Sequence, residues 1–116
     1  MQKLDQNYLG SYPRDALKIL KFIAERYPKK LLFTSPELGK VIGQEGKELG
    51  GILGTFSKRE GDPLIVKVGT TIIYWERERT GRPKQVWALN PELRKSEISQ
   101  IRKILSTFLL EEKVRV

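Results

Sequence analysis

The sequence Arg79-Thr80-Gly81-Arg82-Pro83-Lys84 separates two runs rich in β-branched and aromatic residues, Thr71 to Glu78 and Gln85 to Leu89. Such runs predict two strands, and the Gly and Pro between them disfavour regular structure, so the pattern predicts a β-hairpin. Three of the six connecting residues are cationic, so the tip of the hairpin presents positive charge to solvent. Such a tip is either a solvated turn without a partner or a contact with a polyanion. The rest of the chain helps to decide between these two interpretations.

The overall charge favours a polyanionic partner. The chain of 116 residues has 22 Lys and Arg against 14 Asp and Glu, for a formal net charge of +8 at pH 7. Its 39% hydrophobic and 31% charged residues are typical of one soluble globular domain. Nucleic acid and an anionic membrane surface both suit the positive excess. No apolar run approaches the roughly 20 residues of a membrane span, and the first residues lack a signal-peptide core, so we expect an intracellular, cytoplasmic protein without a membrane partner.

The sequence contains no Cys and no His. Disulfides, thiolate nucleophiles, sulfur ligands for zinc and imidazole bases are therefore excluded. Catalysis by carboxylate-bound magnesium or by Lys remains, and Glu45-Gly46-Lys47 has the Glu-x-Lys spacing found in part of metal-dependent nuclease sites. Because three-residue patterns are common by chance, we expect a protein that is not an enzyme and that needs no metal or cofactor.

Upstream of the hairpin, the hydrophobic pattern predicts three helices. Apolar residues at helical spacing between Pro13 and Tyr27 predict the first, which Pro28 ends. Residues 1–12 lack a sustained period, so we expect a flexible arm or one short extra turn of helix there. The apolar triplet Leu31-Leu32-Phe33, which follows the first helix, predicts a very short strand.

The second and third helices form a predicted helix-turn-helix unit. Ser35 is the expected N-cap of the second helix, and Gly43 is expected to end it. Apolar residues at helical spacing after the turn predict the third helix from about Glu45 to Lys58. Two short helices joined by a Gly-containing turn are the outline of a helix-turn-helix.

The outward face of the third helix is nearly bare. Opposite its apolar side chains, a helical wheel aligns Lys47, Gly51, Gly54 and Lys58, with Gly50 and Thr55 beside them. Each interior Gly destabilises a helix by roughly 0.5 to 1 kcal/mol relative to Ala, so tertiary packing must hold this one. One interpretation is that the bare backbone approaches a nucleic-acid groove closely. The other is that the glycines allow close packing against a neighbouring helix.

The residues after the third helix predict strands. Leu64 to Val68 alternates with a period of two, and Gly69-Thr70 is expected to form a second turn before the run that contains Trp75. Trp75 and Trp87 lie in the apolar halves of their strands, so we expect both to be structural.

This succession of helices, turn and basic hairpin resembles a winged helix-turn-helix domain over Pro13 to Leu89. Gly81 to Leu89 is similar to the wing of the MarR-like, PadR-like and ArsR-like transcription regulators, in which a Gly-Arg-Pro turn precedes an aromatic residue and a Leu. The resemblance implies that the third helix enters the major groove of DNA, while Arg79 and Arg82 reach the backbone or the minor groove. Gly81-Arg82-Pro83 also matches the core of an AT-hook. The glycines of the third helix depart from the family pattern because they present few side chains that read bases, which puts sequence-specific recognition in doubt.

The end of the chain predicts one more helix. Asn90-Pro91-Glu92 places its start near Pro91, with a break near Ser96. An apolar stripe runs along this helix and includes Ile98, Ile101, Leu105 and Phe108. The stripe either packs on its own domain or forms a dimer, as a terminal helix often does in the families that the chain resembles. Its length favours dimerisation through these residues.

The sequence therefore predicts an α+β winged helix-turn-helix domain at residues 13–90, an arm at 1–12 and a dimerising helix at 91–116. The expected function is binding of double-stranded DNA by a homodimeric transcription regulator, with no small-molecule effector inferable. The expected DNA contacts come from the third helix and the hairpin, and they are Lys47, Thr55, Lys58, Arg59, Arg79, Arg82 and Lys84. Two alternatives stay open: a winged helix that binds protein or RNA, and a metal-dependent nuclease.

Overall fold

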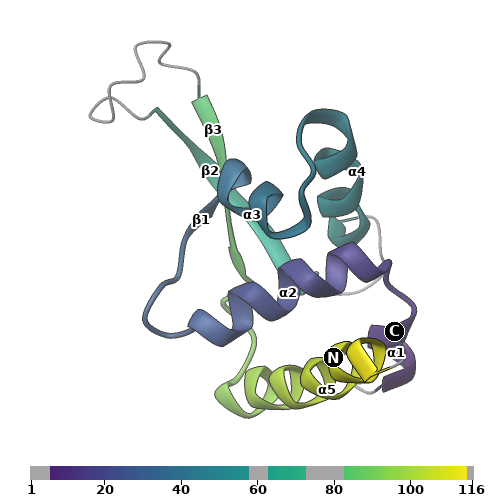
Figure 1. The fold of residues 1–116 in the computed structure, drawn as a ribbon. Coiled ribbons are helices and arrows are strands. Elements are labelled where there is room, and N and C mark those ends of the chain that lie inside the picture. The colour runs from purple at the N-terminus through teal and green to yellow at the C-terminus, as the bar shows by residue number, and fades with distance from the viewer. Residues whose placement is uncertain (1–5, 58–62, 73–82, 115–116) are drawn as a thin grey trace.

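The computed structural model describes residues 6–57, 63–72 and 83–114. Within them the chain forms an α+β fold of five helices and one three-stranded antiparallel sheet (Figure 1). The elements, in chain order, are α1 (Gln6–Gly10), α2 (Arg14–Arg26), β1 (Phe33–Thr34), α3 (Ser35–Ile42), α4 (Gly46–Ser57), β2 (Ile65–Ile72), β3 (Pro83–Leu89) and α5 (Lys95–Val114). The predicted α+β class is confirmed, and the order from α2 to β3 is compatible with a winged-helix layout.

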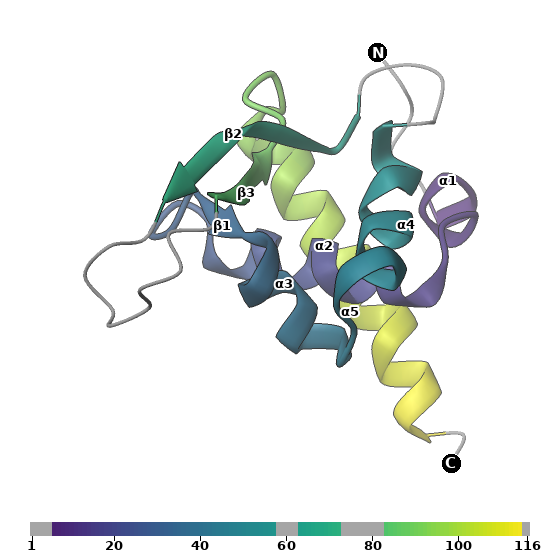
Figure 2. The same ribbon diagram turned by 90° about the horizontal axis from the view of Figure 1, so that it is seen from above.

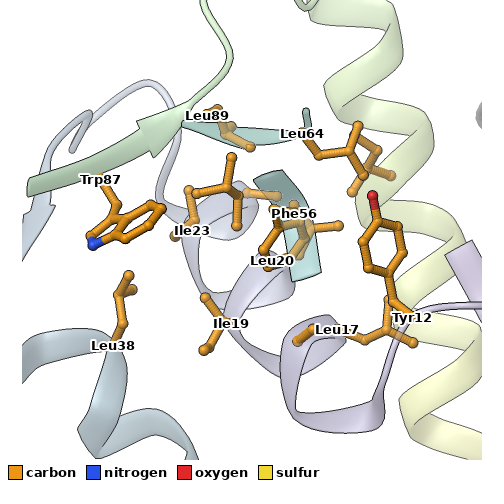
Figure 3. Close-up of a cluster of buried hydrophobic side chains, with 14 of the residues drawn as sticks. Tyr12, Leu17, Ile19, Leu20, Ile23, Leu38, Phe56, Leu64, Trp87 and Leu89 are labelled. Carbon is orange, nitrogen blue, oxygen red and sulfur yellow. The ribbon is translucent and has the colours of Figure 1, made fainter. Parts of the chain in front are cut away.

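α2 is the centre of the hydrophobic core, because its apolar residues recur at helical spacing and are buried. Figure 3 shows Ile19, Leu20 and Ile23 of α2 among core side chains from α3, α4 and β3, including Leu38, Phe56 and Trp87. Figures 1 and 2 show the sheet on one side of the molecule and α4 with α1 on the other, with α2 and α3 between them. The predicted bounds of these three helices agree with α2, α3 and α4 to within about one or two residues.

The sheet has the strand order β1-β3-β2. β2 and β3 pair antiparallel from Ile65 opposite Leu89 to Ile72 opposite Pro83, so they form a hairpin whose connection, residues 73–82, lies outside the described residues. The predicted strand pairing is wrong, because Gln85 to Leu89 lie opposite residues 65–70 and not opposite Thr71 to Glu78. Pro83 and Lys84, which were expected in the tip, belong to β3. The predicted turn at Gly69-Thr70 is wrong, because both residues belong to β2. The register shifts between Lys67 and Gly69, so the strand accommodates one extra residue as a bulge and continues past the glycine.

The junction of β1 and α3 differs from the prediction by one residue. Thr34, not Ser35, is the N-cap of α3, and it forms a capping box with Glu37. The Oε1 atom of Glu37 accepts hydrogen bonds from Thr34 N at 3.1 Å and Thr34 Oγ1 at 3.2 Å. Ser35 instead accepts a hydrogen bond at its Oγ from Trp87 Nε1 at 3.0 Å. Trp87 thereby ties β3 to α3, and its predicted structural role is confirmed.

The N-terminal segment belongs to the fold. Residues 6–10 form α1, and the side chains of Leu9 and Tyr12 are buried. The ring of Tyr12 stacks on that of Phe56 in α4, with centroids 5.0 Å apart. A flexible arm is therefore wrong for residues 6–12, and the alternative of a short extra helix is confirmed.

The last helix begins at Lys95, four residues later than predicted. Asn90 explains the delay, because it is buried and its side chain holds a turn. Its Nδ2 donates to the carbonyl oxygen of Pro63 at 2.9 Å, and its Oδ1 accepts from Glu92 N at 3.0 Å. The predicted break near Ser96 is absent from α5, which is continuous from Lys95.

α5 packs against α2 of the same chain (Figure 1). Ile98, Ile101 and Leu105 are 2%, 0% and 0% exposed within one chain, so they leave no surface for a second copy. Arg102 fixes the contact, since its Nε donates to Ala24 O at 2.6 Å and its guanidinium also donates to Tyr27 O. The prediction that these three apolar residues form a dimer interface is wrong, and the side chain of Phe108 lies outside the described part of the chain.

Candidate nucleic-acid interface

Three glycines fix the corner between α3 and α4. Gly43 and Gly46 have φ angles of 67° and 62°, in the left-handed region that glycine adopts without steric cost. Gln44 N donates a hydrogen bond to Gly39 O at 3.0 Å, which closes the turn. At Gly39 there is no room for a side chain, because an added Cβ would lie 2.4 Å from Gln44 O. The turn between α3 and α4 therefore requires glycine at these three positions.

The outer face of α4, here defined as Lys47, Gly50 and Gly51, is exposed. The opposite face buries Leu49, Leu53 and Phe56. A Cβ added to Gly50 or Gly51 would meet no described atom within 4 Å. The alternative that these two glycines allow close packing of a neighbouring helix is therefore wrong within the described chain. They leave a strip of backbone open to solvent.

The hydroxyl groups of α4 are bonded to the helix itself. Thr55 Oγ1 donates to Ile52 O at 2.7 Å, and Ser57 Oγ donates to Gly54 O at 3.4 Å. Thr55, a predicted DNA contact, is half-buried, and its only donor hydrogen is used inside the helix. Of the predicted contacts in the described part of α4, Lys47 is the one with an exposed side chain.

The predicted hairpin contacts are described only in part. Lys84 lies in β3 opposite Thr71, and its side chain is outside the described residues. Lys58, Arg59, Arg79 and Arg82 also lie outside them. In Figure 1, the ends of β2 and β3 that carry the connecting segment lie on the same side of the molecule as α3 and α4, and α5 lies on the opposite side. The described ends of β2 and β3 and the helix α4 thus both lie on the side of the molecule away from α5.

A hollow of about 470 Å³ separates α3 from the start of α4. It is lined by Ser35, Pro36, Gly39, Lys40, Gly43, Gln44, Glu45, Gly46 and Leu49. Lys40, which is not among the predicted contacts, is exposed in the last turn of α3 and adds a second exposed cation to the helix-turn-helix unit. The sequence could have indicated Lys40 by its position in the last turn of the predicted second helix, just before Gly43.

Glu37 has a structural role at the base of this unit. Burial raises the pKa of its carboxyl, but hydrogen bonds from Lys30 and Thr34 together with the charge of Lys30 outweigh burial and hold the pKa below its usual value. Lys30 Nζ donates directly to Glu37 Oε2. Glu37 is therefore ionised at neutral pH and is not a candidate for proton transfer.

A second hollow, of about 290 Å³, lies at the sheet. The most exposed large apolar residues in the described chain, Leu31, Leu32 and Val68, line it. Lys30 is its one charged lining residue, and that side chain is paired with Glu37. This hollow suits an apolar group better than a phosphate.

The described residues offer little for catalysis. Among them, no group of three His, Cys, Asp or Glu residues is placed to hold a metal ion. Glu45 and Lys47 are both exposed at the start of α4, and the nuclease alternative gains no further ligand there. Within the same residues, no helix has the length and apolar character needed to cross a membrane.

Comparison with known protein families, with curated proteins and with solved structures finds no match to this chain. The observations that bear on function are therefore the arrangement of its own elements and the chemistry of their surfaces. These are a helix-turn-helix corner fixed by glycines, an exposed outer face of α4, a long β2–β3 hairpin and a net charge of +8.

Proposed function

We propose that this chain is a duplex-DNA-binding protein of the winged-helix type. In this proposal α4 docks in the major groove, and the basic hairpin connection contacts the backbone or the minor groove. The observation that carries the proposal is the outer face of α4, where Gly50 and Gly51 are exposed and meet no described atom.

The energetic argument starts from the cost of those glycines. Each destabilises a helix by roughly 0.5–1 kcal/mol relative to Ala, and neither supports a contact within the described chain. A helix with side chains is about 10–12 Å across, while the major groove is about 12 Å wide. A helix without side chains on its leading face therefore sits deeper in the groove, which supports a binding role for the outer face.

The charge supports the same partner. A net charge of +8 attracts a polyanion, and Lys40 and Lys47 are exposed on the two helices of the corner. The predicted contacts Lys58, Arg59, Arg79, Arg82 and Lys84 add cations after α4 and in the hairpin. The resemblance to winged helix-turn-helix regulators makes control of transcription the role we propose for such binding. In this proposal a single chain binds DNA, and no dimer formed through α5 is included.

The test is a set of binding titrations with duplex DNA, duplex RNA and single-stranded DNA of equal length. We expect duplex DNA to bind best, with a slope of log affinity against log salt near −0.9 per contacted phosphate. The deep and narrow major groove of duplex RNA does not admit a helix, so RNA should bind more weakly. No binding of duplex DNA at low salt would rule the proposal out. Tighter binding of RNA would favour the RNA-binding alternative, and magnesium-dependent cleavage would favour the nuclease.

A pair of variants localises the interaction. Arg82→Gln removes one predicted hairpin contact and should weaken duplex binding by about 1–3 kcal/mol, the range for a groove contact. Lys103→Gln removes the same charge from an exposed position on α5, which lies on the side of the molecule opposite α4. Equal losses for both variants would mean that net charge, and not the proposed surface, drives binding.

A further inference from the structure

We infer that α4 docks on duplex DNA without reading the order of the bases, so that the partner is duplex DNA of any sequence. This inference rests on the proposed function and narrows it. The first support is the residue types in α4, whose sequence GKELGGILGTFS contains no Arg, Asn or Gln. Together with Lys, those residues make the commonest hydrogen-bonded contacts with purine edges in the major groove, Arg and Lys with guanine and Asn and Gln with adenine.

The second support is the state of the polar groups that α4 does have. Thr55 and Ser57 both use their hydroxyl hydrogens on carbonyl oxygens of the same helix. Gly50 and Gly51 present only backbone, in which the amide and carbonyl groups of a helix interior are already hydrogen-bonded. The outer face therefore has no free side-chain donor for a base edge apart from Lys47.

Within α4 itself, Lys47 and Glu48 are the remaining exposed side chains of the first turn. Glu48 follows Lys47 by about 100° around the helix, so it lies at the flank of the outer face. Lys47 carries a compact charge on a flexible stem, which suits a phosphate better than the fixed two-point contact that Arg makes with guanine. We therefore assign Lys47 to the phosphate backbone.

The expected behaviour differs sharply from that of a sequence-specific regulator. Sequence-specific proteins bind their sites typically 10³–10⁷ times more tightly than other DNA. For this chain the ratio should be near one. A protein of this kind occupies DNA in proportion to the length of accessible DNA. The protein would therefore influence transcription by occupying or shaping DNA.

The experiment compares matched duplexes whose hydrogen-bonding patterns differ chiefly in the major groove. A pool of random duplexes is first enriched by repeated selection for binding to the full chain. The best-enriched duplex is then compared with a counterpart in which every A·T pair becomes T·A and every G·C pair becomes C·G. This exchange keeps the largely degenerate minor-groove pattern and changes the major-groove pattern at every position. Any preference of the hairpin for A·T over G·C pairs, read from the minor-groove hydrogen-bonding pattern, is therefore held nearly constant.

We expect the two dissociation constants to agree within about threefold, with no consensus in the enriched pool. A difference of about tenfold or more, reproduced with a second exchanged pair, would overturn the inference. A failure to bind any duplex would instead defeat the proposed function, so the two failures are distinguishable.

Lys47→Gln supplies an independent readout. If Lys47 contacts phosphate, the variant should weaken binding to both duplexes by the same factor and reduce the salt slope by about one. Lys103→Gln is the matched control and should leave the salt slope unchanged. A loss for Lys47→Gln on one duplex alone would show that Lys47 reads a base, and this would also overturn the inference.

Discussion

A Cβ atom added to Gly39 would lie 2.4 Å from the carbonyl oxygen of Gln44, closer than real Cβ atoms come to another heavy atom. The same Gln44 donates its backbone N–H to Gly39 O at 3.0 Å. α3 and the turn after it are therefore in contact at a point where only glycine fits. This contact lies in the turn that joins α3 to α4.

The first prediction concerns that contact. We expect Gly39→Ala to lower the free energy of unfolding by about 1–3 kcal/mol, the range for overpacking a tight site. DNA affinity should fall as well, because the methyl group must open the corner between α3 and α4. Denaturant unfolding and a duplex titration measure the two effects. Gly69→Ala is the control, since its added Cβ meets no described atom within 4 Å. A Gly39→Ala variant as stable as the parent would contradict the close approach.

The second prediction separates stability from binding at the outer face of α4. Gly51→Ala should raise the free energy of unfolding by roughly 0.5–1 kcal/mol, because Ala favours a helix and its methyl enters open space. Duplex affinity should fall several-fold, since the methyl stands between the helix and the groove. Thr107→Ala on α5, an exposed position, also favours a helix and should leave affinity unchanged. Unchanged affinity for Gly51→Ala would remove the main support for docking through this face.

The success of the helix predictions has a physical basis. Helices need a local apolar period and end signals, and both are present in the sequence between Pro13 and Lys58. The cap of α3 was misplaced because Thr34 and Ser35 are both good caps. In the structure Thr34 is the cap and pairs with Glu37, while the Ser35 hydroxyl accepts a hydrogen bond from the indole N–H of Trp87, 52 residues later in the chain.

The sequence-based predictions are wrong where the structure depends on contacts with residues far away in the chain. An apolar stripe shows that one helix face is covered, but not whether the covering surface belongs to the same chain, so Ile101 and Leu105 were assigned to a dimer. Gly69 and Thr70 have turn propensity, yet pairing with β3 keeps them in a bulged strand. For the candidate site, the period of the third helix correctly predicted that Gly51 faces outward. The empty space around it required the positions of the other elements.

The third prediction concerns pH. The pKa of Glu37 is lowered in the folded chain, so ionised Glu37 contributes stability above the unfolded value of about 4.3, and this contribution is lost as pH falls through the lower folded value. Glu37→Gln should therefore be less stable than the parent at pH 7, and the difference should shrink as pH falls below about 4. Denaturant unfolding of both proteins between pH 3 and 7 measures the difference. A constant difference across that range would mean that the ionised form of Glu37, with its bonds from Lys30 and Thr34, stabilises the fold no more than the neutral form does.

The last prediction tests whether α5 belongs to the core of one chain. Leu105 is fully buried against the same chain, so Leu105→Glu places a charge where no described partner is available. An unpaired buried charge costs several kcal/mol, and the melting temperature should fall accordingly. Thr107→Glu adds the same charge two residues later at an exposed position, so its melting temperature should stay close to that of the parent.

Light scattering at several concentrations completes this test. If Leu105 lies in the monomer core, Leu105→Glu lowers stability without converting a dimer into folded monomers. If the parent is a dimer that Leu105→Glu dissociates into chains with unchanged melting temperature, then α5 covers a partner instead of its own domain. That result would contradict the packing of α5 on α2, and with it the bonds from Arg102 to the end of α2. A dimer would then present two copies of the proposed binding surface on α4.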